Sequence, residues 1–238
     1  GDTMALFLSL YLGHVLGDFV FQPGKLVVAK RRGTPGVILH TTIVVACTAL
    51  AGAANLDRTW PIVLLAGIAH FGVEHLTIGA RRARESSGLT VFLLDQGVHI
   101  VSLALMALAF DGSVPPVLFI FSVPLDTLAA VCGIATVSFA GSILVFELEV
   151  MRHPAEDPDP ILALDVSRLY GMAERSAGLA LALLTPVPLL GALAFAPRIA
   201  FALTRTGDRR ARHMAAALAG FALCALTWAL ITFFAAAV

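Results

Sequence analysis

Long apolar segments constrain this chain more than any other feature of its sequence. A helix that crosses the hydrocarbon core of a bilayer needs about 20 mostly apolar residues. Seven such segments follow one another along the 238 residues: 3–22, 36–55, 61–79, 89–110, 117–150, 177–203 and 213–236. The sequence therefore predicts an all-α fold, a polytopic transmembrane helical bundle of about seven spans.

The composition excludes the classes of protein that fold in water. Hydrophobic residues make up 58% of the chain and charged residues 13%, whereas a soluble domain carries roughly 25% charged residues. So few charges cannot cover a water-facing surface. The formal net charge of +0 also offers no excess of cations for a phosphate backbone. A soluble enzyme and a nucleic-acid binder are thus excluded, and we expect no nucleic-acid partner.

Prolines interrupt two of the seven segments. They are Pro115, Pro116 and Pro124 around the start of the fifth segment, and Pro186 and Pro188 in the sixth. Since proline breaks helix interiors, we expect the fifth segment to begin irregularly and to continue as a helix over about 126–149. We expect the sixth segment to be kinked or re-entrant.

The chain divides into two parts by this reading. Residues 1–110 form a four-helix membrane bundle, and residues 111–238 form the C-terminal membrane helices, with polar connections at 152–176 and 204–213. Lys and Arg in short connections resist translocation. They gather after the first and third segments: Lys25, Lys30, Arg31 and Arg32, then Arg81, Arg82 and Arg84. We place these two connections in the cytoplasm, and the topology after residue 115 stays open.

Ionisable side chains inside the first four segments mark a candidate site. Such groups are costly in a membrane and usually face the interior of the bundle. Three histidine–carboxylate pairs are four residues apart, which places both side chains on one face of a helix, and a further histidine stands alone. The set is His14 with Asp18, His40, His70 with Glu74, and Asp95 with His99. Each pair can ligate one cation, or the carboxylate can orient the ligating imidazole.

The depth of these residues predicts that they form one cluster. At about 1.5 Å per residue, every pair lies toward the cytoplasmic end of its own helix. Helices that run in alternate directions must carry their polar residues at alternate sequence ends to meet in one place, and these do. We therefore expect one site in the cytoplasmic half of the membrane, roughly within 15 Å of that surface.

Several polar residues beside these pairs have other expected roles. Gln22, His75 and Gln96 are expected to support the cluster without binding the metal. His153 and His213 lie in or beside polar connections, and we expect them to be solvated.

The donor types limit which cation fits. Histidine and carboxylate without sulfur suit zinc, iron, manganese or nickel, and the single cysteines Cys47, Cys132 and Cys224 predict no thiolate site. Seven donors exceed the four of a structural zinc site. This surplus favours two metal ions, or one metal with a spare carboxylate as general base. We expect one or two divalent ions, zinc first with iron and manganese as alternatives, and Glu74 or Asp95 as the catalytic base.

These motifs resemble those of a family of bacterial inner-membrane proteins of unassigned function. Residues 5–100 carry the likeness in Gly13-His14-x-x-x-Asp18-Phe19-x-x-Gln22, His40, His70-x-x-x-Glu74 and Asp95-Gln96-x-x-His99. Glu74 stands where the family has aspartate, which keeps the carboxylate on a longer side chain. The resemblance implies a multi-pass protein of the bacterial inner membrane. A looser likeness to membrane-bound metal-dependent hydrolases implies hydrolysis by analogy alone.

The leading hypothesis is a membrane-embedded metal-dependent hydrolase that acts on a lipid or lipid-linked substrate from the cytoplasmic leaflet. The segment Ser167-Arg168-x-x-Gly171-x-x-Glu174-Arg175 resembles one in longer family members, and Arg168 and Arg175 are candidates for holding a phosphate or carboxylate of the substrate. Two alternatives stay open. One is a divalent-metal transporter, which the ligand-rich cluster on continuous helices disfavours; the other is a structural subunit whose metal-free polar network packs helices.

Overall fold

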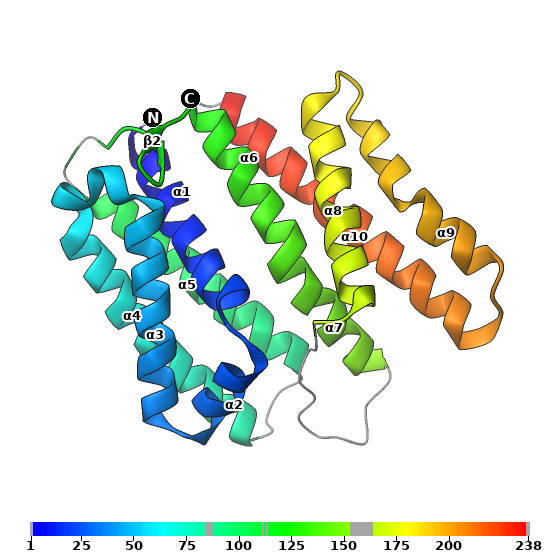
Figure 1. Cartoon of the computed structure of the whole chain (residues 1–238), viewed down its shortest axis with the longest axis horizontal. Helices are drawn as coiled ribbons and strands as arrows, with labels where there is room; N and C mark the ends of the chain where they lie inside the picture. The colour runs from blue at the N-terminus through cyan, green and yellow to red at the C-terminus, as the bar shows by residue number, and fades with distance from the viewer. Residues whose placement is uncertain (1, 84–87, 111, 113, 153–163, 237–238) are drawn as a thin grey trace. The chain divides into compact units, whose positions relative to one another are not determined.

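The computed structural model describes residues 2–83, 88–110, 112, 114–152 and 164–236 (Figure 1). The described chain is helical apart from one short hairpin, which confirms the predicted all-α bundle. Six helical segments in it are long and apolar enough to cross a membrane: Thr3–Val20, Thr34–Ala51, Ala53–Gly79, Gly88–Ala109, Leu125–Arg152 and Gly207–Ala235. The chain forms two compact units, Gly1–Cys132 and Gly133–Val238.

The described part of the first unit contains five complete α-helices, two short helical turns, the hairpin and most of a sixth α-helix. Its elements are α1 (Asp2–Val15) with its π-helical extension η1 (Leu16–Val20), α2 (Gly24–Arg32), α3 (Thr34–Ala51), η2 (Ala53–Asn55), α4 (Leu56–Ala83), α5 (Gly88–Ala109), β1 (Val117–Leu118), β2 (Phe121–Ser122) and the first part of α6 (Leu125–Ala135). Helix α1 packs against α3 and α5, and α4 packs against both α3 and α5. Helices α1, α3, α4 and α5 therefore pack around one another, as a shared polar cluster requires.

Apolar and polar side chains occupy opposite halves of this unit. The apolar core joins the start of α1, the start of α4 and the end of α5, with Leu6, Leu10, Val63, Ala66 and Leu103 among its members. The histidine and carboxylate positions lie at the other ends of the same helices. Burial of the apolar side chains stabilises the packing of these helices. The histidines and carboxylates at the other level are therefore available for a functional site.

Two glycines bring α1 into direct contact with α3. A Cβ atom on Gly13 would collide with the backbone of Thr48, and one on Gly17 would lie 2.6 Å from the Cα atom of Val44. The two glycines are four residues apart, the spacing that lets membrane helices approach closely. This close approach holds the neighbouring residues His14 and Asp18 against α3.

The second unit is built from the end of α6 and the elements η3 (Thr136–Ala140), α7 (Gly141–Arg152), α8 (Val166–Leu184), η4 (Pro188–Phe195), α9 (Ala196–Leu203) and α10 (Gly207–Ala236). Its core contains Val137, Leu179, Phe195, Ala217 and Cys224. Helix α8 packs against η4 and α10, and α9 packs against α10.

Two features of this half add detail to the predicted bundle. The segment 177–203, which we expected to be kinked or re-entrant, is interrupted: α8 ends at Leu184, and η4 then returns along α8 as a shorter apolar stretch with α9, so the described chain has six candidate spans beside this stretch. The prolines predicted this break. The expected polar connections are also partly helical, because α8 begins at Val166 and α10 at Gly207.

The prolines of the fifth segment act as expected. The hairpin of β1 and β2 precedes the helix, which begins at Leu125 after Pro124. His213 lies on α10 with its ring against Phe201, at a centroid distance of 5.0 Å. His153 and Arg84 lie outside the described residues.

Candidate metal centre

The predicted donors of the first four segments meet in one buried cluster of the first unit. Six of them are at least nine-tenths buried, namely His14, Asp18, His40, His70, Glu74 and His99. They come from α1, η1, α3, α4 and α5, so every helix of the bundle around the cluster contributes. Their donor atoms form two groups that share His70.

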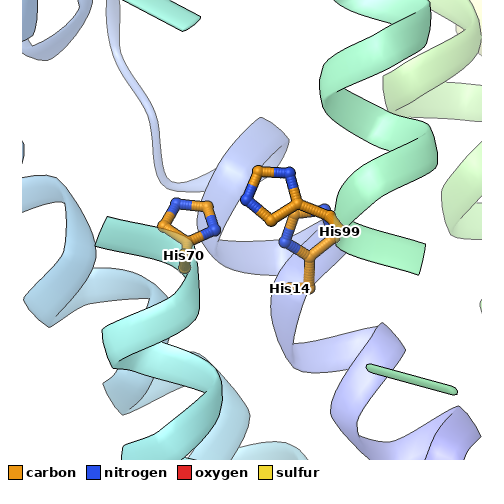
Figure 2. Close-up of side chains that lie close together, drawn as sticks. All are labelled: His14, His70 and His99. Carbon is orange, nitrogen blue, oxygen red and sulfur yellow. The ribbon is translucent and has the colours of Figure 1, made fainter. Parts of the chain in front are cut away.

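The first group consists of three imidazoles. One ring nitrogen from each of His14, His70 and His99 lies within 4.8 Å of the others, and Figure 2 shows the three rings gathered from α1, α4 and α5. The ring centroids are 4.5 Å apart for His70 and His99 and 4.7 Å apart for His14 and His99. Three imidazoles at this spacing could each offer one ring nitrogen to the same cation.

The tautomer of His99 follows from its hydrogen bond. Its Nδ1 atom lies 2.9 Å from the backbone carbonyl oxygen of Asp95. A carbonyl oxygen only accepts, so Nδ1 carries the proton and donates. Nε2 then keeps its lone pair, and this atom is buried without a hydrogen-bond partner. A ligating histidine is usually held in this way by a bond from its other nitrogen.

The second group mixes imidazoles with carboxylates. Donor atoms of Asp18, His40, His70 and Glu74 lie within 4.8 Å of one another. Nε2 of His40 is 3.0 Å from Nε2 of His70, 3.1 Å from Oδ1 of Asp18 and 3.7 Å from Oε2 of Glu74. Ligands about 2.0–2.1 Å from a tetrahedral zinc ion are about 3.3–3.4 Å apart. The observed separations bracket that value.

His70 links the two groups because an imidazole has two nitrogens. Its Nε2 atom faces His40, while its Nδ1 atom is buried and has no hydrogen-bond partner. One ring can therefore serve both groups.

Lys30 also belongs to the cluster. From the sequence we assigned it to the first connection between spans, as one of the cationic residues that set the orientation of the chain in the membrane. Its Nζ atom lies 2.8 Å from Oε1 of Glu74, and both side chains are more than nine-tenths buried. Helix α2 brings it there by folding against α3, so closely that a Cβ on Gly36 would collide with Ala29. The sequence feature that could have predicted the burial of Lys30 is Leu26, an apolar residue four positions earlier and therefore on the same face of α2. The structure buries both residues.

Asp95 lies outside both donor groups and supports them. Its carboxylate accepts hydrogen bonds from Oγ1 of Thr77 at 2.8 Å and from Nε2 of Gln96 at 2.9 Å. Gln96 also donates to Oδ2 of Asp18 at 3.1 Å and accepts from Nε2 of His14 at 3.3 Å. The glutamine thus ties three members of the cluster together, which is the supporting role expected of it.

Gln22 and His75 differ in their relation to the cluster. Nε2 of Gln22 donates to Oδ1 of Asp18 at 3.3 Å, so this residue supports the site. His75 is exposed, with its ring against Phe71 at a centroid distance of 4.6 Å. One residue corresponds to about 100° around a helix, so the position after Glu74 points away from the cluster.

The charges of the cluster favour a divalent cation. With neutral histidines, the carboxylates of Asp18, Glu74 and Asp95 outnumber the ammonium of Lys30 by two negative charges. Buried charge is costly unless it is paired or coordinates a metal. One divalent ion would neutralise this group of side chains.

A small cavity lies against the three-histidine group. Its volume is about 10 Å³, which corresponds to roughly one water molecule. Its lining is His14, His70 and His99 with Val44, Val45, Thr48, Ala66, Gly67, Ala69, Ser102, Leu103 and Met106. The site therefore has space for about one water molecule beside a largely apolar wall.

The two arginines expected to bind substrate belong to the second unit. Arg175 on α8 is buried and donates hydrogen bonds to Val137 and Ser142 of that unit. Arg168 lies in the first turn of α8, where its backbone N–H donates to Asp165.

The match to a known family lies within the first unit. Residues 6–127 match a family model that is described as protein of unknown function (DUF3307). The matched range contains all the donors of the cluster and Lys30. No curated protein and no solved structure matches the chain significantly.

Proposed function

We propose that this chain, which belongs to the family of proteins of unknown function DUF3307, is a membrane-embedded metal-dependent hydrolase. Its substrate would be a lipid or lipid-linked molecule, reached from the cytoplasmic leaflet of the bacterial inner membrane. Zinc is the first candidate for the metal, with iron and manganese as alternatives. The observation that carries the proposal is the pair of buried donor groups that share His70.

The number of donors supports catalysis over a purely structural metal. A structural zinc site is closed by four protein ligands, whereas this cluster offers three imidazoles in one group and two imidazoles with two carboxylates in the other. A bound divalent metal would supply Lewis-acid activation of a water molecule. The cavity beside His14, His70 and His99 has the volume for that water.

Residues of the protein would accept the proton released by the water molecule and hold the donor side chains in position. Glu74 is the better candidate for the general base, because its carboxylate lies in the donor cluster, whereas that of Asp95 does not. Asp95 would act through others, by holding Gln96 and His99 in position. The side chains beside the three-histidine group, Val44 and Leu103 among them, are largely apolar, which favours a substrate with an apolar chain once these side chains move apart.

Metal transport is the second candidate, and one observation favours it. The first span is not a continuous α-helix, contrary to expectation: it changes to a π-helix over Leu16–Val20, the turn that carries Asp18. π-Helical turns are frequent at functional sites, and transporters place ions at helix discontinuities. This feature fits a site that releases its ion as well as one that retains it.

The test of the proposal combines metal content with turnover. Elemental analysis of the purified protein should find bound metal in the wild type and in His75→Ala, whose imidazole is exposed on the same helix, and a loss of at least about tenfold in His70→Ala. Hydrolysis of a phospholipid ester in nanodiscs should stop on chelation and return with zinc. Stoichiometric metal in His70→Ala would remove the basis of the proposal. Uptake into proteoliposomes without hydrolysis would assign transport instead.

A further inference from the structure

The second unit contains a cluster of charged side chains that the proposed hydrolysis does not use. It comprises Arg168, Glu174 and Arg175 on α8 with Arg198 on α9. Glu174, Arg175 and Arg198 are each at least nine-tenths buried. Three guanidinium groups accompany one carboxylate, so these four residues carry two positive charges in excess. Buried cations require hydrogen-bond acceptors or anions.

The acceptors of the two most buried arginines are only partly anionic. Arg198 donates from Nε to Oε2 of Glu174 at 2.6 Å, and its guanidinium lies 4.9 Å from the ring centroid of Tyr170. Arg175 donates from Nε to the carbonyl oxygen of Val137 at 2.6 Å and from Nη2 to Oγ of Ser142 at 2.8 Å. These bonds engage the Nε and Nη2 atoms of the Arg175 guanidinium group, and its Nη1 atom points in another direction.

Both arginines point a terminal nitrogen at Gly171. A Cβ atom added to this glycine would lie 3.1 Å from Nη1 of Arg175 and 3.4 Å from Nη2 of Arg198. Arg168 is three residues before Gly171 and therefore on the same face of α8. Two guanidinium ends that meet over a glycine can together donate several N–H groups to one phosphate.

Two buried atoms of the same cluster have no hydrogen-bond partner. They are Nε of Arg168, a donor, and Oε1 of Glu174, an acceptor. Such atoms are rare in folded proteins and call for an explanation. A phosphate ester with a neighbouring hydroxyl or ammonium group would provide an acceptor for the first and a donor for the second.

We infer that Gly171, Arg168, Arg175 and Arg198 form a binding site for a phosphate group. The ligand is either the headgroup of a phospholipid or a soluble phosphate compound. The site stands on contacts within the second unit alone, so it does not depend on the metal centre or on hydrolysis.

Binding to the purified full-length protein tests this inference with two probes. Inorganic phosphate is titrated in detergent, and phosphatidylglycerol is titrated in phosphate-free glycolipid bicelles. The wild type should bind at least one probe saturably. Gly171→Ala, whose methyl group would press against both guanidinium ends, and Arg168→Gln should each weaken binding by at least about tenfold, since each disturbs a charge-assisted contact.

Two variants serve as matched controls. Gly79→Ala adds the same methyl group to a helical glycine with nothing within 4 Å, and Arg210→Gln removes the charge of an exposed arginine at the start of α10. Both should bind as the wild type does. Helix content by circular dichroism and elution as a single species in detergent report whether each variant is folded, and Arg168→Gln carries the test if Gly171→Ala does not fold.

Each outcome has one meaning. Binding of phosphatidylglycerol alone assigns a lipid headgroup, and binding of inorganic phosphate assigns a site open to soluble phosphate. Equal affinity in the wild type, Gly171→Ala and Arg168→Gln would overturn the inference, as would the absence of saturable binding of both probes. Neither result would affect the proposed metal centre.

Discussion

Lys30 places a positive charge beside the donors that we propose for a metal. It is held at 2.8 Å from Glu74, where it compensates a carboxylate that would otherwise be buried next to that of Asp18. A bound cation would act on the same carboxylate. Lys30 and a bound metal ion would therefore both neutralise the negative charge of Glu74.

Removing the Lys30 charge should destabilise the metal-free protein strongly. Lys30→Met leaves Glu74 buried without its cation, and loss of one partner of a buried ion pair costs about 3–5 kcal/mol. Lys25→Met changes an exposed residue of the same helix and should stay within about 0.5 kcal/mol. The measurement is the free energy of unfolding in detergent. Saturating zinc should narrow the difference, and equal effects of the two variants would show that the ion pair adds nothing.

The shared position of His70 predicts an order among the histidine variants. His14 belongs to the three-histidine group and His40 to the mixed group, whereas His70 belongs to both. If both groups are filled, His14→Ala and His40→Ala should each lose one metal ion per chain and His70→Ala should lose two. Elemental analysis gives the stoichiometry. Equal losses in all three variants would contradict the division into two groups.

At the scale of elements, the close packing of α1 on α3 positions half of the cluster. His14 and Asp18 each follow a glycine that contacts α3 directly. The π-helical turn then carries Asp18 toward His40, at 3.1 Å. The geometry of the site therefore depends on one helix–helix contact.

Filling that contact should separate the two helices. Gly13→Ala places a methyl group against the backbone of Thr48, which cannot move as a side chain can, and overpacking of this kind costs about 1–3 kcal/mol. Gly72→Ala meets nothing within 4 Å and should gain up to about 1 kcal/mol from helix propensity. Thermal unfolding in detergent measures both, and metal affinity should fall only in Gly13→Ala. Unchanged stability in Gly13→Ala would contradict the packing.

Some of the predicted secondary-structure elements were confirmed and others were missed, and the difference has a physical reason. Apolar length and proline position are local properties, so the membrane-spanning helices of the first unit and the break after Leu184 followed from the sequence. The π-helical turn did not, because the same residues fit an α-helix and the extra residue in the turn is accommodated by contacts with α3. The inward fold of α2 was missed for the same kind of reason.

At the scale of the whole molecule, metal binding should couple to stability. A ligand that binds only the folded state stabilises it by RT ln(1 + [L]/Kd), which is about 2.7 kcal/mol at a hundred times Kd. Zinc should therefore raise the unfolding temperature of the full chain and a chelator should lower it. The shift should vanish in His70→Ala and persist in His75→Ala. An equal shift in both variants would mean that zinc binds elsewhere.

What the sequence determined by itself is the set of helices and the donors on their inner faces. Four-residue spacing sets two side chains on one face through backbone geometry alone, so the pairs of His14 with Asp18 and His70 with Glu74 could be predicted. Adjacent positions are harder to assign, and the structure places Gln96 rather than Asp95 at the centre.

Only the tertiary structure decided which atoms meet. It joined His70 to both donor groups, brought Lys30 to Glu74 and set Arg198 beside Arg175 over Gly171. These contacts depend on how far each helix is rotated and shifted against its neighbours. Such rotations are chosen by the packing of many side chains together, and no local pattern in the sequence records them.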